Sequence, residues 1–355
     1  MAPSIRFVIS KGNNMRAAFF SSHGGPEVME IGEIDSPIPG PAEVRIEVRA
    51  VAMNHLDLWA RRGLPFEIPM PHIGGSDLAG VIDLVGPDVD KSVLGSRVVV
   101  NPSLNYEWYE ARNSGFSSFE RPFQILGEHT QGGMAEYCVV PIKNLMEIPQ
   151  NIPFELAAAA PVAYVTAWHA LIGRGRLCPG ESVLITGASG GVSTAAIQIS
   201  RLMGASVYAV TKGSEKVAQA KSLGADYVYD RELVDFAREL WKDTKKRGVN
   251  VALDSVGEPM WEGCLRSMAQ SGRLLVFGGT GGSVITSDVR SIFWKQLSII
   301  GCTMGNPKEF QRVMRLVFEG KLEPSIHAVM PLDQIREAHD LLEKGEVFGK
   351  LVLVP

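Results

Sequence analysis

The chain has 355 residues, of which 45% are hydrophobic and 21% are charged, and its formal net charge is −4. This length exceeds one ordinary hydrophobic core and suits two domains. The small negative charge provides no basic field for nucleic acid or an anionic membrane surface. Four scattered cysteines without a C-x-x-C pair indicate reduced thiols of a cytoplasmic protein and argue against a disulfide framework.

Two segments bear on targeting and membrane insertion. Residues 1–14 precede a strand-like run that starts at Met15, so we expect them to form an extension outside the fold. They lack the basic and apolar regions of a signal peptide. The uncharged stretch Leu156–Gly173 is rich in alanine and is interrupted by Pro161 and His169. It therefore predicts two buried helices and not a membrane span.

Strand-like segments with glycine and proline between them dominate residues 15–162. The clearest are VRIEVRAVAMN, GVIDLVG, SRVVVNP and AEYCVVP. Because strands and helices do not alternate here, we predict a mostly antiparallel, barrel-like domain. We expect residues 307–355, with helical PKEFQRVMRLVFEG and strand-like KLVLVP, to return to the same domain.

Residues 163–306 show a different pattern, in which about six short apolar strands alternate with helices. Helices are expected from Gly191 to Gly204, over Ser214–Leu223, from Glu232, from Glu258 and over Asp288–Lys295. Such alternation predicts a doubly wound parallel sheet of the Rossmann type, which makes the protein α/β. The expected strands are Ser182–Thr186, Ser206–Val210, Tyr227–Tyr229, Val249–Asp254, Arg273–Gly278 and Ser298–Gly301.

A glycine-rich turn, GASGGVS, follows the first of these strands and opens a helix. Glycines at such a turn let the backbone approach a pyrophosphate, whose charge is stabilised at the helix N-terminus. Only Gly190 fits the G-x-G-x-x-G pattern strictly, since Ala188 and Ser193 occupy the flanking positions. The place of the turn between strand and helix, at the start of the alternation, predicts dinucleotide binding.

The end of the second strand bears on the choice of coenzyme. An NAD site usually has an acidic residue there, which binds the ribose 2′-hydroxyl. This strand ends instead at Thr211, and Lys212 and Lys216 follow. The lysines suit a 2′-phosphate and predict NADP(H). Glu215 opposes this interpretation, although it also suits the first turn of the following helix. The alternative is that both lysines are solvated charges at a helix start. The residues expected to bind the cofactor are Thr166, Ser189, Gly190, Gly191, Val192, Thr211, Lys212, Lys216, Val256, Gly257, Phe277, Gly278 and Lys350.

Six motifs span nearly all of Met15–Pro355: AVAMNHLDLWARRG, GGSDLAGVI, ILGEHTQGGMAEYCVVP, TGASGGVS, LDSVG and GKLVLVP. With them the chain resembles the medium-chain dehydrogenase/reductase superfamily, in the branch related to zinc alcohol dehydrogenases and quinone oxidoreductases. The resemblance implies an NAD(P)-dependent oxidoreductase. It also implies a GroES-like substrate domain for 15–162 and 307–355, and a dinucleotide-binding domain for 163–306.

The chain departs from the zinc-binding members at each expected ligand. Asn54 and Val162 stand where those enzymes carry cysteines, and Ser76 stands at the histidine, followed by Asp77 at the glutamate. Asparagine, serine and valine are not normal zinc ligands, so we expect no metal. A site rebuilt from His55 and His72, near the expected substrate cleft, is the alternative. The cysteines of the structural zinc lobe fall on Tyr106, Tyr109, Arg112 and Glu120.

Loss of zinc changes the chemistry that the resemblance implies. Zinc lowers the pKa of a bound alcohol, and the hydroxyl residue that relays the proton is replaced by Leu56. A quinone, an α,β-unsaturated carbonyl or an activated ketone needs only hydrogen bonds to its developing oxygen charge. Trp59 replaces a tyrosine of quinone oxidoreductases and either stacks on the substrate or packs internally. The candidate catalytic residues are Asn54, His55, Asp57, Trp59 and Ser76, with Asp57 orienting its neighbours.

Three functions remain open at this point. The first is zinc-independent, NADPH-dependent reduction of a quinone, enone or activated ketone. The others are a zinc-type alcohol dehydrogenase with substitute ligands, and an NADPH-binding structural or sensing protein with little turnover. The expected partners are a small-molecule carbonyl, enone or quinone and further copies of the chain, without nucleic acid or membrane. The β-branched segment Leu297–Met304 predicts a homodimer or homotetramer through an exposed edge strand.

Overall fold

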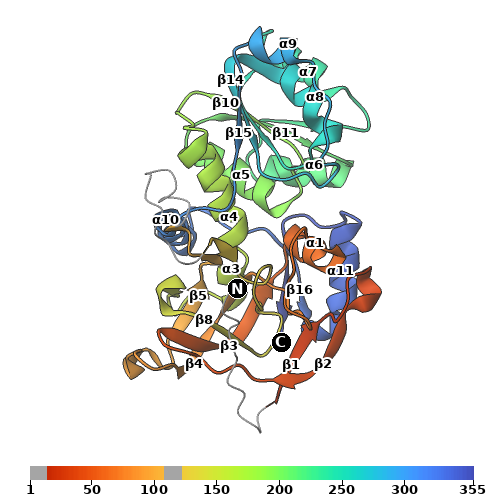
Figure 1. The fold of residues 1–355 in the computed structure, drawn as a ribbon. Helices are drawn as coiled ribbons and strands as arrows, with labels where there is room; N and C mark the ends of the chain where they lie inside the picture. Colours follow the sequence, from red (N-terminus) through yellow and green to blue (C-terminus); the bar gives the residue numbers. More distant parts are fainter. Residues whose placement is uncertain (1–13, 108–121) are drawn as a thin grey trace. The chain divides into compact units, whose positions relative to one another are not determined.

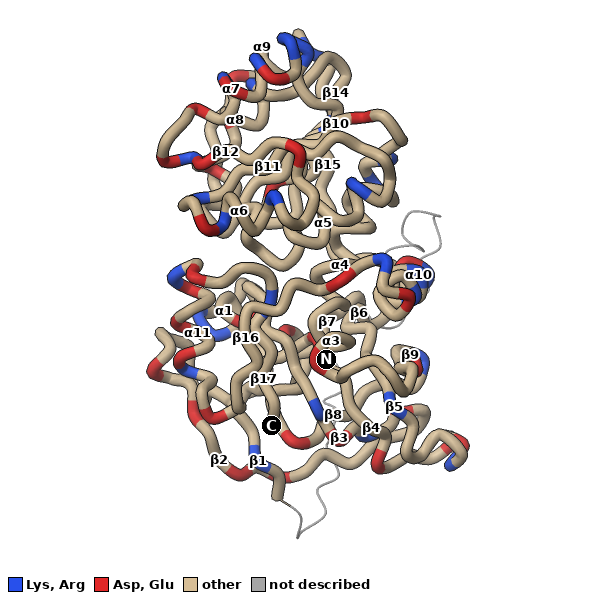
Figure 2. The backbone as a smooth tube through the Cα atoms, turned by 180° about the vertical axis from the view of Figure 1, so that it is seen from behind, with Lys and Arg blue, Asp and Glu red and all other residues tan. Residues whose placement is uncertain are grey.

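A computed structural model describes residues 14–107 and 122–355, which fall into two compact units (Figure 1). The first unit holds the described residues up to Val162, together with Asn306–Phe318 and Ile326–Pro355. The second holds Ala163–Gly305 and the short segment Glu319–Ser325. In both units acidic and basic residues are interspersed along the backbone (Figure 2).

The first unit is built on a sheet that has seven strands among the described residues, in the order β16-β17-β3-β4-β5-β9, with β8 also paired to β3. All its pairs are antiparallel except β16 with β17, which confirms the predicted mostly antiparallel domain. Two small antiparallel pairs, β1 with β2 and β6 with β7, complete its strands. The bounds are β1 Asn14–Phe19, β2 Glu30–Asp35, β3 Glu43–Ala52, β4 Asp77–Val85, β5 Arg97–Val100, β6 Ser103–Leu104, β7 Gln124–Ile125, β8 Tyr137–Pro141, β9 Leu145–Glu147, β16 Ile326–Pro331 and β17 Lys350–Val354.

Alternation along the long strand β3 positions the core of the first unit. Val44, Ile46 and Val48 point to one face and are buried, as are Leu78 and Ile82 of the neighbouring β4. Side chains at every second position of a strand share one face, which is why these residues meet in one apolar cluster. The sheet thereby provides a rigid support for the loops at its ends.

The described part of the first unit also contains α-helices and 3-10 turns between its strands along the chain. They are α1 His55–Arg62, α3 Phe154–Ala158, α10 Pro307–Phe318 and α11 Ile335–Glu343, with 3-10 turns at Pro26–Val28, Lys91–Val93, Ile142–Asn144 and Leu332–Gln334. Helix α1 was not predicted from the sequence. Its first residue follows β3 after only Met53 and Asn54, and Asn54 is the N-cap residue, whose backbone N–H donates to Asp57 Oδ2 at 2.7 Å. Helix α1 carries three of the five candidate catalytic residues.

The second unit contains a six-stranded parallel sheet in the order β12-β11-β10-β13-β14-β15, which confirms the predicted doubly wound sheet. Helices α5 and α6 cover one face and α7 and α8 the other (Figures 1 and 2). The strand order reverses at β10, and ligands bind at such a switch point in open parallel sheets. The strands are β10 Ser182–Ile185, β11 Ser206–Thr211, β12 Tyr227–Asp230, β13 Val249–Asp254, β14 Met268–Val276 and β15 Ser298–Gly301.

The helices of this unit follow the predicted order, with corrected bounds. They are α4 Pro161–Trp168, which continues as a π-helix over His169–Arg174, α5 Gly191–Leu202, α6 Ser214–Ser222, α7 Phe236–Asp243, α8 Glu258–Ser267 and α9 Val289–Phe293. The prediction that α7 begins at Glu232 was wrong. Asp235 is the N-cap residue, and its side chain accepts hydrogen bonds from the backbone N–H groups of Ala237 and Arg238. The helix therefore begins at Phe236.

Candidate functional site

The glycine-rich turn lies at the switch point, between β10 and α5. Gly187 has a φ of +53°, and the N–H of Ala188 donates to the carbonyl of Val210 at 2.9 Å, which fixes the turn against β11. Helix α5 begins after Gly190 with no side-chain cap and no acidic residue in its first turn. A Cβ at Gly190 would meet only the Gly187 oxygen, at 3.5 Å, so the turn is open. An uncapped helix start of this kind fits a pyrophosphate.

The carboxyl ends of β10 and β13 are joined by buried polar contacts beside this turn. The Thr186 hydroxyl donates to Asp254 Oδ1 at 2.5 Å, and Asp254 Oδ2 accepts the N–H of Gly257 at 2.9 Å. Gly257 has a φ of +86°, and a Cβ there would lie 2.2 Å from the Gly282 carbonyl oxygen. Glycine is therefore required at this position, because the two backbones approach closely.

Most of the predicted cofactor residues belong to these strand ends. Ser189, Gly190, Gly191 and Val192 lie in the turn and the first turn of α5, and Thr211 is the buried last residue of β11. Thr166 lies on α4, buried, with its hydroxyl 3.8 Å from Met304 Sδ. The others follow the ends of β13 and β14, and are Val256, Gly257, Phe277 and Gly278.

The predicted coenzyme lysines lie on either side of the start of α6. Lys212 Nζ is 2.8 Å from Glu232 Oε1, in an exposed ion pair. Lys216 lies within the first turn of α6. Glu215 was expected from the sequence to oppose these lysines, but Glu232, which lies beyond the next strand, was not. A signal was present, because adjacent parallel strands end side by side and the residues after β12 must approach those after β11.

Lys350, the last of the predicted cofactor residues, lies in the first unit at the start of β17. Its side chain is 3% exposed, and its ammonium donates to Asn54 Oδ1 at 2.6 Å and to Asp77 Oδ2 at 3.0 Å. Asn54 Nδ2 donates to the same Asp77 oxygen at 2.9 Å, and the N–H of Val162 donates to Asp77 Oδ1 at 2.7 Å. The buried carboxylate is thus neutralised by a cation of the chain itself.

Asp57 is held by two backbone groups. Its Oδ2 accepts the N–H of Asn54 at 2.7 Å and its Oδ1 accepts the N–H of Gly75 at 2.9 Å. Burial raises the pKa of this carboxyl to about 6, against the opposing effect of these hydrogen bonds. Asp57 therefore joins the start of α1 to the segment before β4, and so orients the residues on both.

The other three catalytic candidates differ in what they can offer a substrate. The Ser76 side chain is fully buried, and its hydroxyl donates to the Leu126 carbonyl at 2.5 Å. Trp59, on α1, is 36% exposed. His55 makes no side-chain hydrogen bond within residues 14–107 and 122–355. Burial, with Lys350 and Arg62 nearby, lowers the pKa of the His55 imidazole, so it is neutral at pH 7 and retains one N–H donor.

The residues at the expected metal positions do not fit a zinc ion. No group of three or more His, Cys, Asp or Glu side chains in the described part of the chain could hold one. Asp77 is already paired with Lys350. His72 is buried, with Nε2 3.1 Å from the Gly127 carbonyl and its ring against Phe20.

The structural zinc positions offer no thiolate. Of the four residues there, Tyr106 packs edge-on against Phe123 at 5.7 Å. The remaining three, Tyr109, Arg112 and Glu120, lie outside the described residues.

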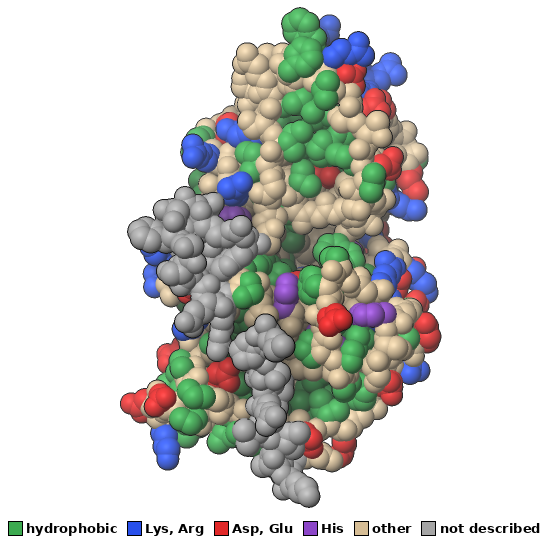
Figure 3. Space-filling view, viewed as in Figure 1, with side chains coloured by type: hydrophobic (Ala, Val, Ile, Leu, Met, Phe, Trp, Pro, Cys, Tyr) green, Lys and Arg blue, Asp and Glu red, His purple; other side chains and the backbone are tan. Residues whose placement is uncertain are grey.

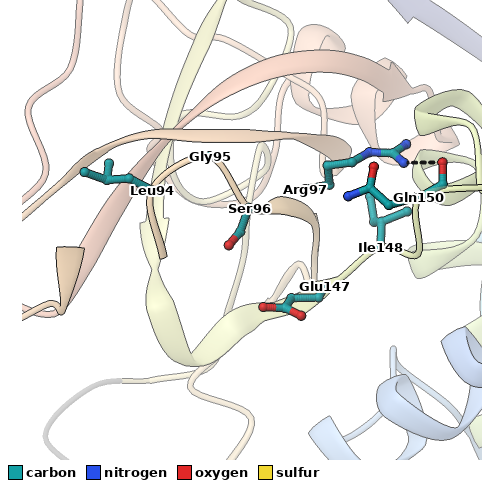
Figure 4. A pocket seen from close by; sticks show the side chains of 7 residues that line it. All are labelled: Leu94, Gly95, Ser96, Arg97, Glu147, Ile148 and Gln150. Atoms are coloured by element: carbon teal, nitrogen blue, oxygen red, sulfur yellow. Dashed lines mark hydrogen bonds between the residues drawn. The ribbon is translucent and has the colours of Figure 1, made fainter. Parts of the chain in front are cut away.

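A shallow pocket on the first unit lies at β5 and the end of β9 (Figure 4). Its arginine, Arg97, donates to the backbone carbonyls of Pro149 and Gln150 at 3.1 and 2.7 Å. None of the predicted site residues lines it, so it carries no argument for the active site. The lining residues are Leu94, Gly95, Ser96, Arg97, Glu147, Ile148 and Gln150.

The doubly wound unit with its open phosphate turn and the antiparallel unit together define an NAD(P)-dependent oxidoreductase of the alcohol dehydrogenase and quinone oxidoreductase type. Two family models match, "Alcohol dehydrogenase GroES-like domain" over residues 40–150 and "Zinc-binding dehydrogenase" over 191–319. The chain belongs to the medium-chain dehydrogenase/reductase superfamily, as predicted.

The similarity to individual relatives covers almost the whole chain. An alcohol dehydrogenase of Geobacillus stearothermophilus is 32% identical over 347 residues, covering 96% of this chain and 99% of that protein. The quinone oxidoreductase of Homo sapiens is 29% identical over 349 residues, covering 96% and 98%. A solved NAD-dependent alcohol dehydrogenase superposes with a TM-score of 0.89 at 40% identity, covering 96% and 100%. None of the described helices has the length and apolar character needed to cross a bilayer.

Proposed function

We propose that this protein is an NADP(H)-dependent, zinc-independent oxidoreductase that reduces a quinone, an α,β-unsaturated carbonyl or an activated ketone. The observation that carries the proposal is the buried contact of Lys350 with Asp77 and Asn54, at 3.0 and 2.6 Å. An ammonium there leaves no anionic cavity for a metal ion. Without a metal, an unactivated alcohol lacks the group that lowers its pKa, whereas an activated acceptor does not need it.

The side chains of the first unit stabilise the acceptor oxygen in this proposal. A reduced nicotinamide, when bound, would supply a hydride to an electrophilic carbon of the substrate, and a proton from water would complete the reduction after negative charge has developed on the conjugated oxygen. The neutral His55 imidazole donates its N–H to that oxygen as negative charge develops there. Asn54 and Asp57 fix the start of α1 and hence the position of His55, and Trp59 presents an apolar surface to a flat substrate.

The second unit binds the cofactor in this proposal. Its uncapped α5 receives the pyrophosphate, while Lys212 and Lys216 lie after β11, where a 2′-phosphate is bound in folds of this type. A charge-assisted contact to a phosphate is roughly twice as strong as a neutral hydrogen bond. This difference supports a preference for NADPH over NADH.

We also propose that two copies pair through β15. This strand is the last in the parallel sheet, and Ile299 on it is 42% exposed. Apolar side chains gather over α9 and beside it (Figure 3). They include the exposed Val289, Phe293 and Trp294. An exposed edge strand next to an apolar surface favours a two-fold, isologous pairing.

A substrate panel tests the reaction. Oxidation of NADPH is followed with a quinone, an enone and an aryl ketone. Reduction of NADP is followed with a primary alcohol. Each assay is run with and without a chelator. We expect turnover of the activated acceptors that the chelator does not change, and no zinc by elemental analysis. Stoichiometric zinc lost together with activity would instead support the zinc-type alcohol dehydrogenase. NADPH binding without turnover of any substrate would support a structural or sensing protein.

A further inference from the structure

The loops that follow β11 and β12 are joined by two hydrogen bonds, and a third fixes the second loop internally. The Arg231 N–H donates to the Thr211 carbonyl at 3.0 Å, and the Gly213 N–H donates to Asp230 Oδ2 at 3.0 Å. Asp230 Oδ1 accepts the N–H of Glu232 at 3.0 Å. These contacts fix the backbone of Glu232 beside the loop that carries Lys212. The nearness of the two side chains therefore follows from the fold and not from chance on a flexible surface.

The ion pair between Lys212 and Glu232 is exposed to solvent. Nζ and Oε1 are 2.8 Å apart, and the side chains are 60% and 52% exposed. Pairs at this level of exposure contribute little to stability, because water and salt screen them. Lys212 can therefore exchange Glu232 for a phosphate at little cost. Glu232 then remains as a carboxylate close to the new anion and opposes it.

The place of the pair is the end of the second strand, next to the phosphate turn. Ala188 in that turn donates to Val210 of β11, so the strand end and the turn are adjacent. Folds of this type bind the ribose of the adenosine half at this strand end, where an acidic residue accepts the 2′-hydroxyl. Thr211 has no carboxylate for this role. Glu232 brings a carboxylate to the same place from the loop after the neighbouring strand.

We propose that Glu232 is a coenzyme-specificity residue, which accepts the ribose 2′-hydroxyl of NADH and opposes the 2′-phosphate of NADPH. The proposal rests on the proposed binding of the dinucleotide at this turn. Lys212 and Glu232 act as opposite halves of one recognition site, the cation favouring the phosphorylated coenzyme and the anion limiting that preference. The chain then uses NADPH more readily than NADH but does not exclude NADH.

Calorimetric binding of adenosine 2′,5′-bisphosphate and of AMP tests the proposal without turnover. In Glu232→Gln the ratio of the AMP dissociation constant to that of the bisphosphate should rise about fivefold, since the opposing charge is gone and the amide keeps the shape. Glu239→Gln is the matched control, because Glu239 also forms an exposed ion pair, with Lys242 at 2.7 Å. The control should leave the ratio unchanged.

The outcomes separate this inference from the proposed NADPH preference. A ratio in Glu232→Gln within twofold of the wild-type ratio overturns the role of Glu232, whichever coenzyme the protein prefers. If the wild-type protein binds AMP better than the bisphosphate and Glu232→Gln still raises the ratio, the NADPH preference fails and the role of Glu232 stands. Absence of binding of both ligands to wild-type protein overturns both proposals.

Discussion

The Lys350 ammonium lies 3.0 Å from the Asp77 carboxylate in the interior of the first unit, although 273 positions separate the two residues in sequence. The side chains are 3% and 0% exposed, so neither charge is solvated when the other is removed. Asn54 bridges them, with its amide oxygen to the lysine and its amide nitrogen to the aspartate. The contact ties the C-terminal strand β17 to the start of α1, and so supports the proposed position of His55.

Replacing Lys350 with Met should lower the free energy of unfolding by about 3–5 kcal/mol, because Asp77 is left as an unpaired buried charge. The double variant Lys350→Met with Asp77→Asn should recover part of that loss. Urea unfolding measures both. Lys143→Met removes an exposed ion pair with Glu107 and should cost less than about 1 kcal/mol. Equal losses in the single and the double variant would show that the two charges are not coupled.

His55 is expected to act as a neutral donor. Replacing it with Leu, which has no donor, should lower kcat about a hundredfold, the usual loss for one donor to a developing oxyanion. Because burial lowers the pKa of the imidazole below its ordinary value of 6.5, kcat of the wild-type protein should be constant above pH 7. His327→Leu, an exposed change on β16, is the matched control and should leave kcat unchanged. A wild-type profile that rises as His55 becomes protonated would contradict the neutral donor.

His339 should make the fold sensitive to acid. Burial and the adjacent Arg61 guanidinium, at 3.1 Å, lower its pKa to about 3, against about 6.5 in the unfolded chain. Between these values the unfolded state binds more protons, so stability is complete above pH 6.5 and falls as the pH drops.

From pH 7 to pH 5 the free energy of unfolding of the wild-type protein should fall by about 2 kcal/mol more than that of His339→Gln. The glutamine keeps an acceptor for Arg61. The raised pKa of Asp57 acts with the opposite sign over this range, but it is common to both proteins and cancels in the difference. Urea unfolding at the two pH values measures the effect. Parallel losses in the two proteins would rule out His339 as the source.

The coenzyme preference assigned to Lys212 and Lys216 predicts an unequal effect of their removal. Replacing both with Ala should raise the KM for NADPH about tenfold or more and leave the KM for NADH nearly unchanged, because only the former carries the 2′-phosphate. Lys221→Ala, at the exposed end of α6, is the control. Steady-state kinetics with both coenzymes decide the matter. Equal rises in both KM values would show that these lysines do not recognise the phosphate.

The sheet of the second unit could be predicted because its signals are local. Each strand is a short apolar run, and the turn before Gly191 combines glycines with a helix start. Helix α1 could not be predicted in the same way. It buries Arg61 completely, and that burial depends on His339 and Glu343 at the far end of the sequence, at 3.1 and 2.7 Å.

The candidate site was predicted only in part, because its motifs are local but its contacts are distant in sequence. The segment Asn54–Asp57 and the pair Ser76 and Asp77 were found from their motifs, but not the hydrogen bonds that engage Ser76 and Asn54 within the protein. Lys350 was identified as a cofactor residue from its motif. Its contact with Asp77 is set by the antiparallel pairing of β17 with β3 and of β3 with β4, which no local pattern reveals.

The proposed dimer is tested by a charge on the edge strand β15. Ile299 is exposed in the single chain, so Ile299→Lys should leave the fold intact and place two like charges close together where the strands of two copies would pair. Light scattering at micromolar concentration should give about twice the 38.5 kDa of one chain for the wild-type protein, and about that mass for the variant. Val329→Lys, an exposed change on β16 at the edge of the other sheet, should remain dimeric. Circular dichroism shows whether Ile299→Lys remains folded. A wild-type protein with the mass of one chain, or a loss of assembly in Val329→Lys but not in Ile299→Lys, would place the interface elsewhere or nowhere.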